Sequence, residues 1–266
     1  MEFTFREGKR EDFERWFAME CACFRRTPDW KENARHEWFT FFDRGAMLSL
    51  VIEGKDRGGK PQMCAFAAAV FVTDAFSKWL RAGGAPYNLV HATKPMADGS
   101  WPLIERSHLA EANTEPGLNL MVTHWTWAEP FLSPEAAHSV RSALEEQFFR
   151  VYQGYCLREI LIEGFGTKFR ERCEYAGLRC LSDFGEYYRT HPRPENPDHF
   201  PFLMGIMARE SRLRDGCALV RSFLYTPPRF YFNEEERHVL CEARLRRSDR
   251  EIAEGLCTSL STIKYR

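Results

Sequence analysis

The chain has 266 residues, of which 44% are hydrophobic and 14% aromatic, so it can form a folded core and is not a disordered protein. Because 37 Lys and Arg face 38 Asp and Glu, the net charge of −1 gives no overall attraction to nucleic acid or to an anionic membrane, and any such contact needs a local patch. The N-terminus has no apolar signal region and no apolar run reaches a membrane-spanning length, so we expect a soluble, cytoplasmic protein without membrane contact. The nine cysteines form no metal-binding pattern, so we expect reduced thiols and no metal.

Strand-like and helix-like segments alternate through the N-terminal two thirds of the chain. The first four are expected as a strand at 2–8, a helix at 10–24, a strand at 46–54 and an apolar strand within 58–74. Gly58 and Gly59 favour a turn that joins the last two strands as a hairpin. The stretch from 76 to 117 is rich in glycine and proline, and we expect a helix and a long excursion there.

A second series of segments follows this excursion. Residues 117–127 alternate as a strand, which would place His124 on one face and Trp125 and Trp127 on the other. Ser133 and Pro134 predict the start of a long helix, because serine caps free N–H groups and proline suits a first turn. The remaining segments are expected as a strand at 157–164, a helix at 167–178 and a final strand at 179–188.

The order β-α-β-β-excursion-β-α-β-α-β predicts an α/β domain with a mixed sheet over residues 1–189. Together with the segment "LREILIEG…TKFRERCEYAGLRCLSDF", in which Tyr175 and Gly177 precede the last strand, this order resembles the GNAT acyltransferases. The resemblance implies a GNAT-like fold, coenzyme A as cofactor and acyl transfer as activity.

One departure from the GNAT pattern changes the functional expectation. The family binds the coenzyme A pyrophosphate with a glycine-rich loop before a helix, where N–H groups approach the phosphates. Here the corresponding segment, "TWAEPFLSPEAAHSV", contains no glycine, and Glu129, Pro130 and Pro134 oppose phosphate binding. We therefore expect no cofactor, and a domain that senses a ligand or a partner. The alternative is an acyltransferase with a tyrosine as acid, the candidates being Tyr152, Tyr155 and Tyr175.

Aromatic residues suggest a weak candidate ligand pocket. His124, Trp125 and Trp127 lie together in "THWTW", although ordinary core packing explains them as well. A pocket for an acyl-homoserine lactone also fits an α/β domain with many tryptophans, but no spacing in the sequence favours it.

Two further regions follow the α/β domain. Residues 190–228 contain four prolines in "THPRPENPDHFP" and are expected to form a linker or hinge with one short helix. Residues 229–266 contain two capping boxes, Asn233 with Glu236 and Ser248 with Glu251, which predict short helices joined by a tight turn. This is the plan of a helix-turn-helix domain.

The pattern "SDREIAEGLCTSLSTIK" resembles the LuxR-type DNA-binding domain. The same pattern also occurs in sigma-factor region four, but nothing upstream in this chain resembles a promoter-melting domain. The resemblance implies contacts with the major groove of double-stranded DNA. The residues expected at this contact are Ser259, Ser261, Thr262, Lys264, Tyr265, Arg266, Arg247 and Arg250. Because the family has further helical residues after this point, we expect the helix-turn-helix domain to be incomplete at residue 266.

These features together predict a DNA-binding transcriptional regulator. Its α/β domain would sense a small molecule or a protein effector, its C-terminal helix-turn-helix would read DNA, and the full-length form would be a homodimer. The alternative is a GNAT-type acyltransferase with an appended DNA-binding module.

Overall fold

The computed structural model describes residues 3–24, 28–55, 61–113, 116–128, 132–152 and 155–207, together with Ser248 and Arg250. The chain divides into two compact units, Met1–Pro228 and Arg229–Arg266. In the second unit only Ser248 and Arg250 are described, and both are exposed. The account below therefore concerns the first unit.

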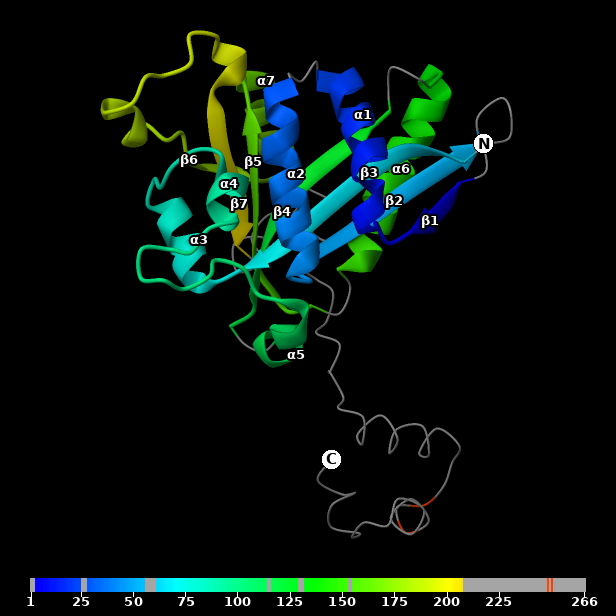
Figure 1. Cartoon of the computed structure of the whole chain (residues 1–266), viewed down its shortest axis with the longest axis horizontal. Coiled ribbons are helices and arrows are strands. Elements are labelled where there is room, and N and C mark those ends of the chain that lie inside the picture. Colours follow the sequence, from blue (N-terminus) through cyan, green and yellow to red (C-terminus); the bar gives the residue numbers. More distant parts are fainter. Residues whose placement is uncertain are drawn as a thin grey trace. The chain divides into compact units, whose positions relative to one another are not determined.

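A seven-stranded mixed sheet forms the centre of this unit, in the order β1-β2-β3-β4-β5-β7-β6 (Figure 1). The strands are β1 (Thr4–Arg6), β2 (Met47–Lys55), β3 (Pro61–Val72), β4 (Leu118–Trp127), β5 (Leu157–Phe165), β6 (Arg179–Ser182) and β7 (Pro201–Met207). Strands β4 and β5 are parallel, whereas each of the other neighbouring pairs is antiparallel. The predicted α/β class with a mixed sheet is confirmed.

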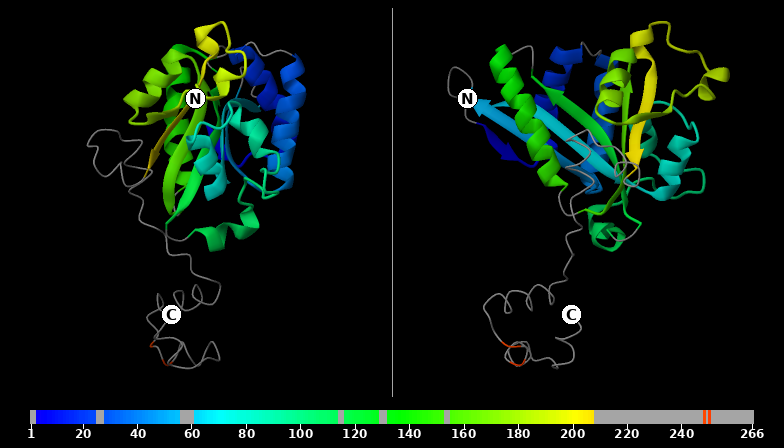
Figure 2. Two further views of the ribbon diagram at one scale, coloured as in Figure 1. Left: turned by 90° about the vertical axis from the view of Figure 1, so that its left-hand side faces the viewer. Right: turned by 180° about the vertical axis from the view of Figure 1, so that it is seen from behind.

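Helices cover both faces of the sheet, α1 and α2 on one side and α6 and α7 on the other (Figure 2). The helices are α1 (Phe13–Phe24), α2 (Pro28–Asp43), α3 (Asp74–Arg81), α4 (Asn88–Ala92), α5 (Leu109–Ala112), α6 (Pro134–Val151) and α7 (Thr167–Tyr175). Short 3-10 helices lie at Arg10–Asp12, Arg106–His108, Tyr187–Arg189 and Pro197–His199.

The predicted start of α6 is confirmed. Ser133 has an extended backbone and accepts a hydrogen bond from the N–H of Ala136, and Pro134 lies in the first turn. One face of the helix then buries Val140, Leu144 and Phe148 against the sheet, at the three- and four-residue spacing of a helix. This face holds α6 against β2, β3 and β4.

Two elements differ from the sequence-based expectation. Strand β7 lies within the segment 190–228 that the sequence assigns to a linker, and it pairs with β5 and β6, so 179–188 does not hold the final strand. Its sequence, "PFLMGIM", is buried along almost its whole length, and such a short apolar run lacks the alternation that identifies a half-buried strand. Helix α2 was not predicted either, although it buries Trp38 and Phe41.

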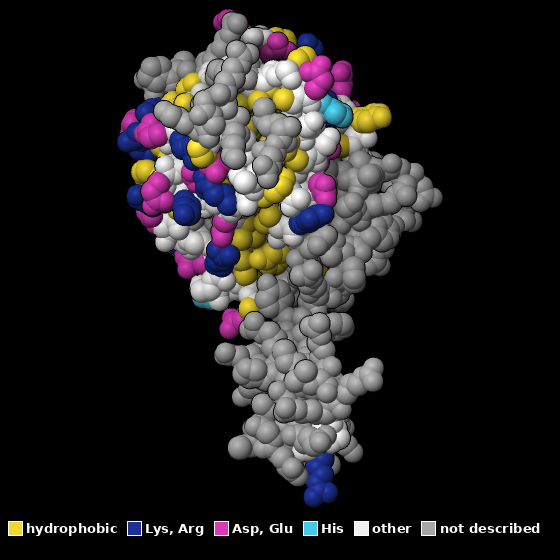
Figure 3. All heavy atoms as spheres, turned by 90° about the vertical axis from the view of Figure 1, so that its right-hand side faces the viewer, with side chains coloured by type: hydrophobic (Ala, Val, Ile, Leu, Met, Phe, Trp, Pro, Cys, Tyr) yellow, Lys and Arg dark blue, Asp and Glu magenta, His cyan; other side chains and the backbone are white. Residues whose placement is uncertain are grey.

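Charged side chains of both signs are interspersed on the face drawn in Figure 3. Near β1, for example, Arg6 bonds Asp12 at 2.7 Å and Glu53 at 2.9 Å, and Arg15 also bonds Glu53 at 2.8 Å. Such pairing agrees with the balanced composition and leaves little net local charge. Among the described residues, no helix is both long and apolar enough to cross a membrane.

Candidate active site

Strand β4 contains a β-bulge in its middle. Ala68 of β3 pairs with His124, but the next residue, Ala69, pairs with Val122, so Thr123 is an extra residue without its own partner on β3. A bulge bends its strand and increases the local twist. It also reverses the alternation of faces, because the residues beyond it are shifted by one position.

The parallel pairing of β4 with β5 stops at this bulge. The last partners are Val122 and Ile162, although β4 continues to Trp127 and β5 to Phe165. Figure 1 shows the two strands running apart beyond this point. The edge of β4 that faces β5 therefore has no ladder partner from β5 after Val122. This free edge lies at the carboxyl ends of the two strands, where α/β sheets commonly bind ligands.

Glu163 is the first residue of β5 after the last pair with β4. Its carboxylate accepts hydrogen bonds from the backbone N–H groups of Tyr87 and Asn88, each at 2.7 Å. Burial raises the pKa of Glu163 from 4.5 to about 7, and these two bonds oppose the shift. Glu163 thus titrates near neutral pH.

A second carboxyl group, on helix α2, interacts electrostatically with Glu163. Glu37 of α2 is 9% exposed. Burial, and then the charge of Glu163, raise the pKa of Glu37 from 4.5 to about 7. Both acids therefore have a pKa near neutral pH, where either can hold or release a proton.

Polar groups without partners lie beside this pair. The side chain of Asn88 is buried, and neither its amide nitrogen nor its oxygen has a hydrogen-bond partner among the described residues. The hydroxyl of Thr123, the extra residue of the bulge, is also buried without a described partner. Tyr87 has a backbone φ of 66°, a left-handed conformation that non-glycine residues rarely adopt. Such strain and unpaired groups concentrate at functional sites.

Tyr188 adds a hydroxyl group to the pair. Burial raises its pKa to about 12, and Tyr87, Tyr187 and Glu163 add to this shift. Tyr188 therefore stays protonated near neutral pH and is able to donate a proton. Sequence analysis missed Glu37, Glu163 and Tyr188. A signal did exist for Glu163, which shares a strand face with the buried Leu161.

The candidate pocket residues of "THWTW" do not form one pocket. His124 packs in the aromatic cluster on the α1–α2 side of the sheet, with its ring 4.6 Å from Trp16. Trp125 and Trp127 belong to the cluster on the α6 side, and Trp125 packs edge-on against Phe148 at 4.7 Å. The alternation of the strand alone separates His124 from Trp125 and Trp127, as the sequence predicted, and the bulge places the two tryptophans on the same face as Val122.

The tyrosines considered as acids in the sequence are not placed for that role. Tyr152 is buried among apolar residues on the α6 side, and its hydroxyl donates to the backbone oxygen of Leu48 at 3.1 Å. Tyr175, at the end of α7, is 95% exposed. Tyr155 packs against Phe71, again on the α6 side.

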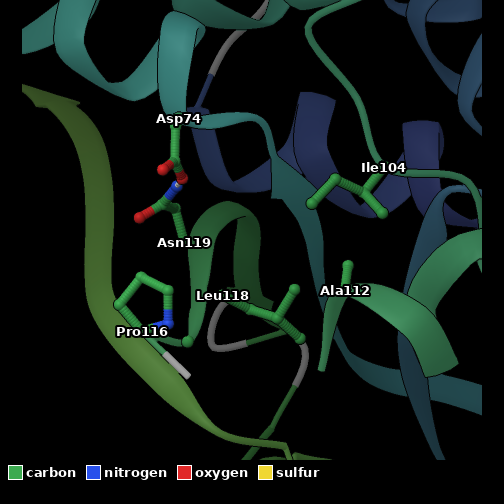
Figure 4. Close-up of a pocket in the computed structure, with 7 residues that line it drawn as sticks. Asp74, Ile104, Ala112, Pro116, Leu118 and Asn119 are labelled. Atoms are coloured by element: carbon green, nitrogen blue, oxygen red, sulfur yellow. Dashed lines mark hydrogen bonds between the residues drawn. The ribbon is translucent and has the colours of Figure 1, made fainter. Parts of the chain in front are cut away.

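A small pocket at the opposite ends of β4 and β5 has a different character (Figure 4). It is lined by Asp74, Ile104, Ala112, Pro116, Gly117, Leu118 and Asn119 and has a volume of about 180 Å³. Its polar groups already bond one another, since Asn119 donates to Asp74 at 3.0 Å and Arg158 binds both side chains. Arg158 also lowers the pKa of Asp74, which stays ionised. The polar side chains of this pocket therefore stabilise the fold by bonding one another, and we do not assign the pocket as the active site.

The N-terminus of α6 does not fit the pyrophosphate of coenzyme A, which the GNAT resemblance implies. Pro134 has no N–H group, and the N–H groups of Ala136 and Ala137 are bonded to the side chain and the backbone oxygen of Ser133. The carboxylate of Glu135 lies in the same turn and would repel phosphate. This agrees with the expectation from the sequence, and no step below involves this cofactor.

The residues predicted to contact DNA lie outside the described residues, except Arg250, which is exposed. Their predicted role stays untested by the structure.

No family model matches the chain, and no curated protein matches it. Solved structures that match include Arabidopsis thaliana NAA60 in complex with acetyl-CoA, at 13% identity over 77% of this chain and 99% of that chain, with a TM-score of 0.43. Another is Chaetomium thermophilum Naa20 in complex with a bisubstrate analogue, at 12% identity over 80% of this chain and 91% of that chain, with a TM-score of 0.42. A third is FeeM, an N-acyl amino acid synthase from uncultured soil microbes, at 10% identity over 83% of this chain and 96% of that chain, with a TM-score of 0.41.

The described domain has a mixed α/β fold with a seven-stranded sheet. The prediction of a DNA-binding transcriptional regulator is contradicted, because the matching solved structures include a GNAT-family acetyltransferase, a spermidine/spermine N-acetyltransferase and the N-acyl amino acid synthase FeeM, and nothing in the described residues supports a LuxR-type domain. The GNAT-type alternative is the one that agrees with these matches.

Proposed function

We propose that the α/β domain is an acyltransferase that moves an acyl group from a thioester to an amine or hydroxyl acceptor. The observation that carries this proposal is the Glu37–Glu163 pair at the place where β4 and β5 separate. A general base works best when its pKa lies near the working pH, and both carboxyl groups have a pKa of about 7.

The free edge of β4 beyond Val122 suits an extended substrate. The free edge of β4 from Thr123 onwards presents backbone groups that β5 does not pair with, and an extended chain can bind such an edge as an added strand. The acyl group would then enter at the bulge, where the unpaired Thr123 hydroxyl lies. The carbonyl carbon would lie within reach of an acceptor held near Glu163.

In the proposed reaction, the acceptor attacks the thioester carbonyl and the Glu37–Glu163 pair takes the proton that the acceptor loses. The tetrahedral intermediate then collapses, the carbon–sulfur bond breaks, and the new amide or ester forms. Tyr188 is the proposed proton donor to the departing thiolate, because it stays protonated near neutral pH and interacts with Glu163. The tyrosine later regains a proton from solvent.

The test measures thiol release by the full chain from acyl thioesters, with a panel of amine and hydroxyl acceptors. We expect acceptor-dependent release whose rate rises as the pH passes about 7, since the base must be ionised. Glu163→Gln and Glu37→Gln should each lower kcat by about 10²-fold or more, the range of general base catalysis. Tyr188→Phe should lower kcat with little change in KM.

Glu171→Gln is the matched control, since this acid is exposed on α7 and should leave the rate unchanged. Wild-type protein that releases no thiol with any thioester and acceptor would refute the proposed function. Activity that survives both glutamate substitutions would refute the assigned base.

A further inference from the structure

The first turn of α6 offers few N–H groups to a phosphate. Pro134 lacks one, the N–H of Ala136 donates to the Ser133 side chain at 3.3 Å, and that of Ala137 donates to the Ser133 backbone oxygen at 2.8 Å. The backbone of Glu135 itself and the Ser133 side chain lower the pKa of the Glu135 carboxyl, which is therefore ionised in this turn. A helix N-terminus binds an anion through free N–H groups, and here the protein has supplied its own acceptors.

Charge and shape at this terminus also oppose a phosphate. Glu135 is ionised and carries a negative charge in the first turn, where the helix dipole would otherwise favour a bound anion. The nearest arginine along the helix, Arg141, bonds Glu145 at 3.1 Å. No glycine occurs from Leu118 to Tyr152, so every residue of the turn carries a Cβ or a proline ring that keeps a diphosphate away from the backbone.

We infer that the acyl donor is a thioester recognised through its acyl group and thioester arm alone, without a nucleotide diphosphate bound at the N-terminus of α6. This inference rests on the proposed function, and it names the class of donor. The free edge of β4 beyond Val122 binds the arm, and the capped start of α6 excludes the nucleotide. A donor of this class ends at its pantetheine-type arm or continues into a carrier other than a nucleotide.

Binding tests the inference without any turnover. Titration calorimetry on the full chain with 3′,5′-ADP and with free coenzyme A should show no saturable binding at ligand concentrations up to about 1 mM. A dissociation constant of that size corresponds to a binding free energy of only about 4 kcal/mol. Saturable binding of 3′,5′-ADP to the wild-type protein would overturn the inference.

A gain-of-binding variant tests the physical cause. Ser133→Gly combined with Glu135→Gln removes the cap from the Ala136 N–H and the charge from the turn, so binding of 3′,5′-ADP should become measurable. Glu146→Gln, an exposed acid farther along the same helix, is the control and should gain nothing. If circular dichroism shows an intact fold and the double variant still binds no nucleotide, the capped helix is not the cause and the inference falls.

Turnover separates this inference from the proposed function. The kcat/KM for S-acetyl-N-acetylcysteamine and for acetyl-pantetheine should lie within about threefold of that for acetyl-CoA, because the nucleotide adds no binding energy. A preference for acetyl-CoA above about tenfold, with inhibition by 3′,5′-ADP, would overturn the inference and leave the acyltransferase proposal intact. Absence of turnover with all three thioesters would instead count against the proposed function, and the calorimetry would still decide the nucleotide question.

Discussion

The pH dependence of stability offers a direct test of the buried acid at position 37. Burial and the Glu163 charge raise the pKa of Glu37 from 4.5 to about 7. Since the folded protein holds this proton more tightly than the unfolded chain does, the unfolded state ionises first as the pH rises. The free energy of unfolding should therefore fall between about pH 4.5 and pH 7 and level off above that range.

The size of this effect follows from the difference between the two pKa values. One pKa unit corresponds to about 1.4 kcal/mol, so ionised Glu37 lowers the free energy of unfolding by about 3 kcal/mol at pH 8. Glu37→Gln removes the titrating group and keeps nearly the same volume. We expect the variant to equal the wild type near pH 4.5 and to exceed its stability by up to about 3 kcal/mol at pH 8.

Urea denaturation followed by circular dichroism between pH 4.5 and pH 8.5 measures this difference. Glu32→Gln is the matched control, because Glu32 is exposed on the same helix, and its curve should run parallel to that of the wild type. A Glu37→Gln curve that also runs parallel to the wild type would show that Glu37 is not held in its neutral form, and would refute the reasoning behind the proposed base.

Two further predictions concern the packing around β4. Arg158→Met should lower the free energy of unfolding by about 1–3 kcal/mol, measured by urea denaturation, because it leaves the buried Asn119 side-chain oxygen without its donor. Arg150→Met, on the surface of α6, is the control and should lower it by less than about 0.5 kcal/mol. Equal losses for the two variants would refute the role of Arg158. Gly117→Ala should lower the free energy of unfolding by about 3 kcal/mol or more, because φ is 99° and a Cβ would lie 2.8 Å from the Cys156 backbone oxygen. Gly99→Ala is the control and should lower it by about 1 kcal/mol, because φ is 81° but a Cβ would meet open space. Similar melting temperatures for the two variants would contradict this prediction.

The sequence by itself determined the elements whose signals are local. The start of α6 at Ser133 and Pro134 follows from capping chemistry, and its apolar spacing identifies the face that packs on the sheet. The absence of glycine before α6 likewise indicated, without a structure, that a pyrophosphate would not fit. These features depend on residues within a few positions of one another.

Tertiary structure decided the features that depend on pairing between distant segments. Strand β7 reads as part of a proline-rich linker, and only its pairing with β5 and β6 makes it a strand. The bulge at Thr123 is visible only from the register with β3, and it reverses the faces assigned to His124 and to Trp125.

The candidate site also depends on segments that are distant in the sequence and meet only in the folded domain. Glu37 and Glu163 are 126 positions apart in the printed sequence, and neither belongs to a motif. Their pKa values are raised because folding buries both carboxyl groups and brings their charges within range of each other. Burial and proximity are properties of the assembled sheet and its helices, so local sequence patterns predicted the scaffold but not the acid pair that it holds.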